Sequence, residues 1–389
     1  MKKYSIFCYL LIAIFYIVQV SVLGFTVYFL NENGYTALEV GVLLAVFGII
    51  AANVQPLLGY IADTNEKVDF KSILTWRGFV TAALFIPLYL FDKNKIVIGV
   101  LFGIIFVLTS SMSPFVNASC FYYTNKGINV DFGKARGFGS FSFAIASYIL
   151  GAFTKTHGSR VVSFNGIIFA IVFLAIVMAL PRVDGASVEN KVESKKVTSN
   201  KIDIIGFIKK YPSFFLMFLA TVFAMCFQNA DCGYLIQIIE DLGGDSSQLG
   251  TANAIAAMVE IPIMFTISRI IKKIKVKKLI AIACFMYVLR GFVFHIPTLK
   301  AIYFAQFLQM FSYAILIPVT VYLSNEEMQE EDKNRGQTFI GMAVTIGLIL
   351  GSFVGGELIS RGGTNLLETG CIVIALISFL FALLGNIVK

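Results

Sequence analysis

The chain has 389 residues and a net charge of +8, and 58% of its residues are hydrophobic while only 14% are charged. Soluble domains are close to half apolar and about a quarter charged. This chain therefore carries more apolar surface than a soluble core can bury, which excludes a soluble enzyme or binding domain. The composition predicts an all-α integral membrane protein, and at roughly 20 residues per crossing this length fits about twelve transmembrane helices.

The predicted membrane crossings are apolar segments separated by polar connections rich in Asn, Gly, Asp and Lys. The first segment follows Lys2 and Lys3, but it is too long for a signal peptide and lacks a small-x-small cleavage site. We therefore interpret it as the first span. The twelve predicted spans are 5–30, 38–61, 72–91, 96–122, 137–154, 161–181, 213–237, 249–270, 279–297, 300–323, 338–356 and 367–387.

The basic residues are distributed unevenly between the two sides of these spans. With an internal N-terminus, 23 of the 31 Lys and Arg residues fall in cytoplasmic segments and 6 in outer loops. This bias is the positive-inside signal, so it predicts a multi-pass protein of the cell membrane with both termini in the cytoplasm. The basic run from Lys272 to Lys278 is then an anchor at anionic lipid, and we expect no nucleic-acid partner.

One connection is much more polar than the others. Residues 182–203 (RVDGASVENKVESKKVTSNKID) show no apolar periodicity and divide the spans six and six. The sequence thus predicts an N-terminal six-helix bundle at 1–181, a cytoplasmic linker at 182–212 and a C-terminal six-helix bundle at 213–389. Two parallel halves of this kind resemble the major facilitator architecture. The alternative is an ordinary long loop in an unrelated twelve-span protein.

The connection between the second and third spans contains Gly59, Asp63 and Lys67 in the order G-x-x-x-D-x-x-x-K. It resembles the facilitator signature in which an acid at a helix end is followed by basic residues. The resemblance implies a gating motif, in which the acid pairs with basic groups and holds neighbouring helices in one state. The equivalent connection in the second half, from Ser268 to Lys278, keeps the basic residues and lacks the acid.

Two charged residues lie deep within predicted spans. Glu260 is near the middle of the eighth span, and Arg290 is similarly deep in the ninth. A charge at the centre of a bilayer costs about 2.5–3.5 kcal/mol on insertion scales, so such residues usually face a cavity or each other. Glu260 is therefore a candidate to bind substrate or a proton. The alternative is a buried Glu260–Arg290 ion pair that only fixes the packing.

Other polar residues also interrupt the apolar segments. Asp231 follows Gln228 and Asn229 by less than one turn, which suggests a stripe that faces a cavity. Arg77 stands next to Trp76 near a span end, and we expect its side chain to snorkel to the cytoplasmic interface. Uncharged amides in four spans together suggest a water-filled cavity between the halves; they are Gln19, Asn53, Gln55, Asn117, Gln306 and Gln309.

The sequence gives no sign of a metal site or of catalysis. All six cysteines fall within apolar spans, where they are interpreted as small core residues. His157 and His295 are isolated from them and from each other. We therefore expect no cofactor, no metal and no enzymatic activity, and a chain that works as a monomer.

Two neighbouring stretches carry a more specific resemblance: Ser113 to Tyr122, and the Phe132-Gly133-Lys134-Ala135-Arg136 stretch that continues to Ser140. They resemble the fourth and fifth helices of the lactose permease branch, the oligosaccharide:proton symporters, with their F-G-[RK]-x-R-x-x-G pattern. The wider group includes nucleoside:proton symporters and phenylpropionate-permease-like proteins. The similarity continues thinly over most of the chain, around Glu260, Arg290 and Gln309.

The resemblance implies roles for five residues. Arg136 matches the arginine that grips substrate hydroxyls, and Glu260 matches the carboxylate that accepts hydrogen bonds from them. Phe143 falls where the sugar transporters place a stacking aromatic ring, and Asn117 falls where they place an acid. Arg290 matches the arginine of the proton-coupling site. Hydropathy alone leaves Arg136 at the membrane margin, so the resemblance moves it inward.

The chain also departs from the lactose permease pattern. The coupling site of that group has a histidine and a glutamate one turn apart in the tenth span, and Gln309 and Ser312 stand there in this chain. The departure argues against galactosides and leaves Glu260 or Asp231 to carry a proton. We expect a secondary transporter that imports a sugar, a nucleoside or a similar hydroxylated solute with protons. The alternatives are a proton-driven transporter of aromatic or organic acids and an exporter of amphipathic compounds.

Overall fold

The computed structural model describes residues 2–388 except 65–69, 92–93, 129 and 182–203. The described residues form helices and no strands, as the all-α prediction requires. The helices of the first half are α1 (Lys2–Gln19), the π-helix η1 (Val20–Gly24), α2 (Thr26–Glu32), α3 (Ala37–Thr64), α4 (Phe70–Leu90), α5 (Lys95–Asn125), α6 (Phe132–His157) and α7 (Arg160–Ala179).

The second half begins with a short helix inside the region predicted as linker, 182–212; residues 182–203 of that region lie outside the described residues. The helices of the second half are α8 (Ile204–Lys210), α9 (Pro212–Asp231), α10 (Leu235–Asp241), α11 (Ser246–Ile271), α12 (Val276–Phe294), α13 (Leu299–Phe307), the 3-10 turn η2 (Leu308–Met310), α14 (Tyr313–Glu327) and α15 (Lys333–Ile387). Gly362 and Gly363 interrupt α15, and Gly363 has a φ of 68°, which glycine adopts at little cost.

The chain is a multi-pass membrane protein. Ten of the helical segments in the described residues are long and apolar enough to cross a bilayer. One of them, Arg335–Ile387, has 53 residues, which is more than twice the length of a single crossing and contains the break at Gly362 and Gly363. The predicted span at 279–297 corresponds to α12, which is not one of these ten.

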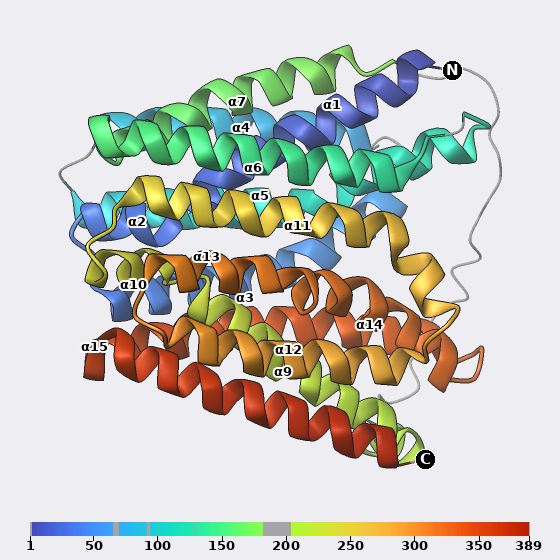
Figure 1. Cartoon of the computed structure of the whole chain (residues 1–389). Coiled ribbons are helices and arrows are strands. Elements are labelled where there is room, and N and C mark those ends of the chain that lie inside the picture. The colour runs from blue at the N-terminus through green and yellow to red at the C-terminus, as the bar shows by residue number, and fades with distance from the viewer. Residues whose placement is uncertain (1, 65–69, 92–93, 129, 182–203, 389) are drawn as a thin grey trace.

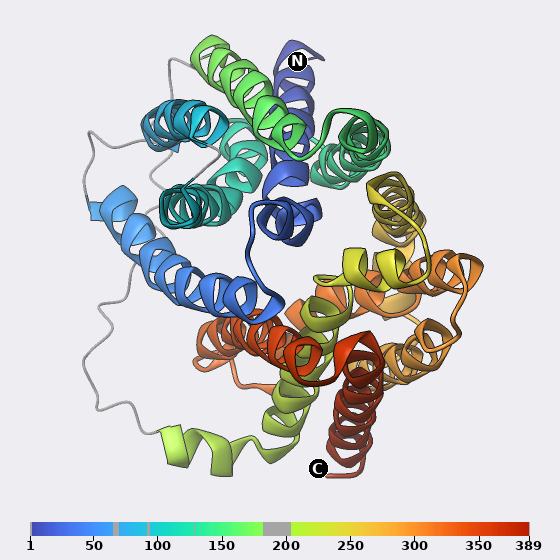
Figure 2. The same ribbon diagram turned by 90° about the vertical axis from the view of Figure 1, so that its left-hand side faces the viewer.

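The helices of the first half lie together in the upper part of Figure 1, and those of the second half lie below them, with α3 beside the lower group. Figure 2 shows the same grouping along the helix axes. Two pairs of helices join the halves: α6 packs along α11, and α3 packs along α15. Both chain ends lie at one end of the molecule, here called the terminal side, and the opposite end is called the far side.

Local sequence signals start several of these helices. The Asp131 side chain accepts a hydrogen bond from the Lys134 backbone N–H at the start of α6. Asp245 and Gln248 form a capping box at the start of α11. Both devices satisfy backbone N–H groups that have no partner within the helix. Because Asp131 caps α6, the helix begins at Phe132, five residues before the predicted span at 137–154, and Arg136 lies inside the helix.

Three crossings that the sequence predicts as simple spans are interrupted. The first passes through the π-helix Val20–Gly24, the seventh through the turn at 232–234, and the tenth through Leu308–Met310. Non-helical backbone at this depth is tolerated where it is buried in protein or lines a cavity. All three interruptions meet the cavity described below, so they place backbone and side-chain polar groups at its wall.

The prediction for Arg77 is wrong. The side chain does not snorkel to the interface but is buried, with 6% of its surface exposed. Its guanidinium donates to the Leu108 carbonyl oxygen at 3.1 Å and to the Ser111 hydroxyl, both on α5. Polar acceptors inside the protein replace the water that snorkelling would provide, so Arg77 ties α4 to α5.

Candidate functional site

A cavity of about 430 Å³ lies between the two halves of the chain. Its wall combines aromatic rings with many neutral hydrogen-bonding groups and two charged side chains. From the first half the polar and aromatic lining residues are Phe15, Tyr16, Gln19, Thr26, Phe106, Ser113, Arg136, Ser140 and Phe143. From the second half they are Gln228, Asn229, Cys232, Tyr234, Asn253, Glu260, Gln306, Gln309, Tyr313 and Ser352.

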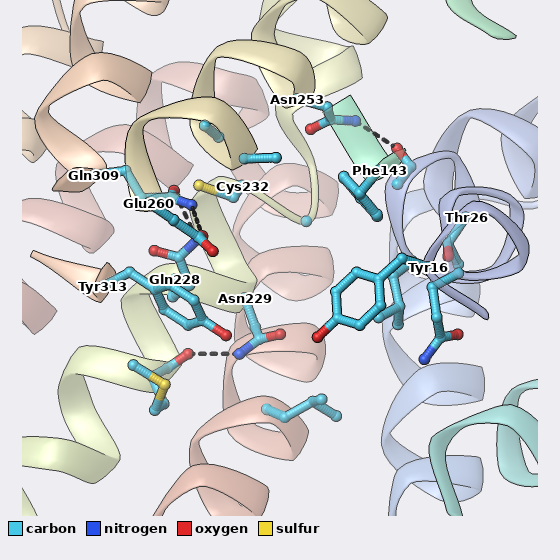
Figure 3. A pocket seen from close by; sticks show the side chains of 18 of the residues that line it. Tyr16, Thr26, Phe143, Gln228, Asn229, Cys232, Asn253, Glu260, Gln309 and Tyr313 are labelled. Carbon is cyan, nitrogen blue, oxygen red and sulfur yellow. Dashed lines mark hydrogen bonds between the residues drawn. The ribbon is translucent and has the colours of Figure 1, made fainter. Parts of the chain in front are cut away.

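The first-half wall presents a cation and several aromatic rings. The Arg136 guanidinium lies over the Tyr16 ring, 4.8 Å from its centroid, which is a cation–π contact. Phe143, two turns further along α6, also lines the cavity. In Figure 3 the Tyr16 hydroxyl points across the cavity toward Asn229 and Tyr313 of the second half. Arg136 is thus held in place by an aromatic ring while its N–H groups remain available to a solute.

The second-half wall presents a carboxylate within a chain of hydrogen bonds. The Gln309 amide donates to Glu260 Oε1 at 2.9 Å. The amide oxygen of the same Gln309 accepts from Arg290 Nη2 at 3.2 Å. Gln309 therefore connects Glu260 to Arg290, and the two charges do not form a direct ion pair. Figure 3 shows Glu260 and Gln309 side by side at the cavity wall.

Arg290 lies behind this wall and has no exposed surface. All its hydrogen-bond acceptors are neutral: the Ala305 carbonyl oxygen at 3.1 Å, Gln228 at 2.9 Å, Ser312 at 3.1 Å, Cys232 at 3.2 Å, Gln306 at 3.4 Å and Gln309 at 3.2 Å. Neutral acceptors hold the guanidinium in position without cancelling its charge. A buried cation of this kind requires an anion nearby, and the carboxyl groups that interact with it electrostatically are Glu260 and Asp231.

Asp231 is buried outside the cavity wall. It is fully buried, and neither of its carboxyl oxygens has a hydrogen-bond partner. Its neighbours Gln228, Asn229 and Cys232 line the cavity, but Asp231 is not among the lining residues. The predicted polar stripe at the end of α9 therefore exists, with its acid turned into the second-half bundle.

The other predicted site residues lie apart from the cavity. Asn117 on α5 is half-buried and does not line it, and its side-chain oxygen has no hydrogen-bond partner; Ser113, one turn earlier, takes that place in the wall. Gly59 lies in α3, where an added Cβ atom would meet nothing within 4 Å. The Asp63 side chain and Lys67 lie outside the described residues, so the gating motif stays a prediction.

Sequence reasoning missed several wall residues. Tyr16, Tyr313 and Asn253 line the cavity, and the Asn253 amide donates to the Gly24 carbonyl oxygen at 2.9 Å, which links the two halves. Tyrosine is common at membrane interfaces and in packed cores alike. The sequence therefore held no signal to single out these two tyrosines. Groups of three or more His, Cys, Asp or Glu side chains that could hold a metal are absent from the described residues.

The far side of the interface between the halves is closed by backbone packing. A Cβ atom added to Gly151 of α6 would lie 2.6 Å from the Ser246 carbonyl oxygen of α11. On the other pair, a Cβ on Gly41 of α3 would lie 2.6 Å from the Ser352 carbonyl oxygen of α15. Lys155 and Asp245 add an ion pair at 3.0 Å. Toward the terminal side, α6 and α11 diverge (Figure 1).

Comparison with known proteins supplies the family. A curated relative is the maltose permease of Geobacillus stearothermophilus, which is 23% identical over 367 residues that cover 91% of this chain and 88% of the permease. The uncharacterized transporter YwbF of Bacillus subtilis (strain 168) is 25% identical over 304 residues, 76% of this chain and 71% of that protein.

A solved structure shares the fold over nearly the whole chain. The crystal structure of the nucleoside transporter NupG superimposes with a TM-score of 0.78 at 16% identity and covers 98% of both chains. The model of the MFS_1 like family matches residues 9–367. The chain thus belongs to the MFS_1 like family of major facilitator transporters.

Proposed function

We propose that this transporter imports a small hydroxylated solute, a sugar or a nucleoside, together with protons, by alternating access. The observation that carries the proposal is the cavity in which Arg136 from the first half and Glu260 from the second half face the same space. A solute that bonds to both side chains joins the two halves. The remaining polar wall is made of amides and hydroxyls, which pair well with neutral hydroxyl groups.

We further propose twelve membrane crossings in two six-helix halves that turn about the cavity. The break at Gly362 and Gly363 divides α15 into two crossings, and α12, with 19 residues, adds one more. Basic residues gather in the connections of the terminal side, which supports a cytoplasmic location for both chain ends. With the far side outward, the packing of Gly151 and Gly41 corresponds to a state closed to the outside.

Glu260 is the proposed proton carrier of the transport cycle. It lies at the cavity wall, where water from either side reaches it in turn, and it bonds to Gln309 rather than directly to Arg290. A neutral glutamic acid can still bond to Gln309 and a solute hydroxyl, and an ionised one gains the attraction of Arg290 and Arg136. Proton binding and solute binding thus act on the same oxygen atoms, which couples them.

A second candidate, transport of aromatic or organic acids, is supported by Arg136. Among the described residues Arg136 has a cation–π contact with Tyr16 and no ion pair with a carboxylate. An unpaired guanidinium at a cavity wall suits a carboxylate as well as a hydroxyl. The names of the maltose permease and of the nucleoside transporter favour the hydroxylated solutes.

The test uses purified protein in liposomes with an acidic exterior, and maltose, uridine and phenylpropionate as labelled probes. The proposal expects accumulation of maltose or uridine above the equilibrium level, and loss of that accumulation when a protonophore collapses the gradient. Accumulation of phenylpropionate alone would establish the second candidate. Uptake of maltose or uridine that ignores the pH gradient would contradict proton coupling.

A further inference from the structure

A groove of about 490 Å³ lies on the outer surface of the first half, between α4 and α7. The two helices pack side by side in the upper part of Figure 1, and both are long and apolar enough to cross a bilayer. Among the described residues, the groove shares no lining residue with the solute cavity. Its lining residues include Lys71, Thr75, Trp76, Phe79, Leu174 and Met178.

A lysine fixes a positive charge at the terminal-side end of this groove. The Lys71 ammonium donates to the Met178 carbonyl oxygen at 2.9 Å and to the Leu180 carbonyl oxygen at 2.8 Å. These two carbonyl groups belong to the end of α7, and the carbonyl end of a helix attracts cations. Because Lys71 stands in the first turn of the membrane-crossing helix α4, its charge lies where the head groups of a bilayer begin.

The rest of the groove is apolar and open to the bilayer. The Trp76 and Phe79 rings stack with their centroids 6.4 Å apart, and 67% and 55% of these two residues are exposed. Tryptophan is enriched at the level of the head groups, where its ring contacts lipid chains. From Lys71 to Phe79 the helix rises about 12 Å, so the groove fits within one leaflet of a hydrocarbon core about 30 Å thick.

The wall behind the groove is closed by direct packing of α4 on α7. A Cβ atom added to Gly78 would lie 3.2 Å from Phe173 Cδ1 and 3.8 Å from Leu174 Cδ1. The neighbouring Arg77 is buried and donates to α5 on another face of the helix. The two helices therefore touch at Gly78 and are tied together at Lys71. A molecule that fills the space outside these contacts has to come from the bilayer.

We propose that this groove binds one anionic phospholipid of the terminal-side leaflet, with its phosphate at the Lys71 ammonium and one acyl chain along Trp76 and Phe79. Charge complementarity and the apolar wall together select this occupant. The fixed cation attracts a lipid with a net negative charge, and the stacked rings contact its chain. A phospholipid without net charge has only the second advantage. The inference goes beyond the proposed function and requires neither a particular solute nor proton coupling.

The test uses Trp76 itself, because the chain contains a single tryptophan. Purified protein is placed in phosphatidylcholine vesicles that contain a small fraction of phosphatidylglycerol with brominated acyl chains, since bromine quenches tryptophan fluorescence on contact. Brominated phosphatidylcholine at the same mole fractions is the reference. Half-maximal quenching should need about fivefold less of the brominated phosphatidylglycerol, which is the factor that one lysine contributes at an anionic lipid surface.

Substitutions of Lys71 separate a binding site from general attraction of anionic lipid. In Lys71→Gln the two brominated lipids should quench alike. Lys71→Arg should keep the preference, because a guanidinium also binds phosphate. Lys273→Gln is the matched control, since it removes one exposed positive charge from the basic run before α12 in the second half. It should show the same preference as the unmodified protein.

Three outcomes would overturn the proposal. Equal quenching by the two brominated lipids in the unmodified protein would show that the groove does not select an anionic phospholipid. A preference that falls equally in Lys71→Gln and Lys273→Gln would assign it to the general positive charge of the terminal side. Weak quenching by both lipids would show that something other than lipid, such as a second copy of this chain, covers Trp76.

The comparison of the two lipids uses the unmodified protein, so it decides the question even if the Lys71 variants do not fold. It also needs no solute and no pH gradient. A chain that accumulates no solute can still show the lipid preference, and a chain that accumulates solute can lack it. The failure of this inference and the failure of the proposed function are therefore distinguishable.

Discussion

Replacing Gly250 by Ala should shift the transporter toward a state that is open on the far side. The added methyl group would lie 2.9 Å from the Gly151 Cα across the interface of α11 and α6. Overpacking of this kind costs about 1–3 kcal/mol. Because the contact exists only while the far side is closed, the ratio of open to closed molecules should rise by about 5- to 150-fold.

The substitution should leave the helix itself intact. Within a helix, alanine is more favourable than glycine by roughly 0.5–1 kcal/mol, so α11 gains local stability while the interface loses it. Gly341→Ala on α15 is the matched control, since a Cβ atom there meets nothing within 4 Å. It provides the local gain without the clash.

The chain contains a natural reporter for this experiment. Cys232 lines the cavity and is partly accessible, whereas the other five cysteines are buried. A membrane-impermeant maleimide added outside intact cells should label Cys232 at least about fivefold faster in Gly250→Ala than in the unmodified protein. Cys232→Ser identifies the labelled thiol. Equal labelling rates in Gly250→Ala, Gly341→Ala and the unmodified chain would refute the view that glycine packing closes the far side.

Three further substitutions test the site and the terminal side. Gln309→Leu removes the hydrogen-bond donor to Glu260 and one acceptor of Arg290. Because hydrogen bonds to charged groups contribute about 1.5–3 kcal/mol, initial rates of gradient-driven uptake should fall roughly 10- to 100-fold. An unchanged rate would remove Gln309 from the coupling path. Arg136→Gln should weaken solute binding, measured by equilibrium dialysis, more than Arg136→Lys does, because lysine keeps the positive charge. Equal affinities of the two variants would show that the charge of Arg136 is dispensable for binding. Lys210 donates to Asp332 at 2.7 Å and holds the pKa of that carboxyl below its usual range, and Asp332 lies in the connection before α15. Asp332 therefore stabilises the fold above its unfolded pKa of about 3.9 and loses this effect as the pH falls through its lower folded pKa. Asp332→Asn should lower the Tm at pH 7 and leave it unchanged near pH 2, and a Tm difference that persists in acid would contradict the ion-pair explanation.

The sequence predicted the residues whose presence in a span is costly. Glu260 and Arg290 stood out because charged side chains are rare in apolar segments, and the structure brings them to one cluster through Gln309. The same reasoning gave a wrong prediction for Arg77, because the oxygen atoms that accept its hydrogen bonds belong to a different helix, α5. The hydropathy of the surrounding residues in the sequence does not show whether a neighbouring helix buries a side chain.

The sequence could not predict contacts that depend on how helices turn about their axes. Asp231 belongs to a polar stripe, yet its side chain faces the bundle while its neighbours face the cavity. His295 was interpreted as isolated, and its partner Glu368 lies 73 positions further along the chain. The interruption at Val20–Gly24 arises in a segment whose hydropathy indicates only that it can cross the membrane.

The central claim, that protons drive solute movement through Glu260, is tested most directly by Glu260→Gln in liposomes. The amide keeps the shape and can bond to Gln309 and the solute, but it cannot carry a proton. The account predicts that the variant exchanges labelled solute across the membrane at equal concentrations and fails to accumulate it with an imposed pH gradient. Accumulation at the unmodified level in Glu260→Gln would contradict the account.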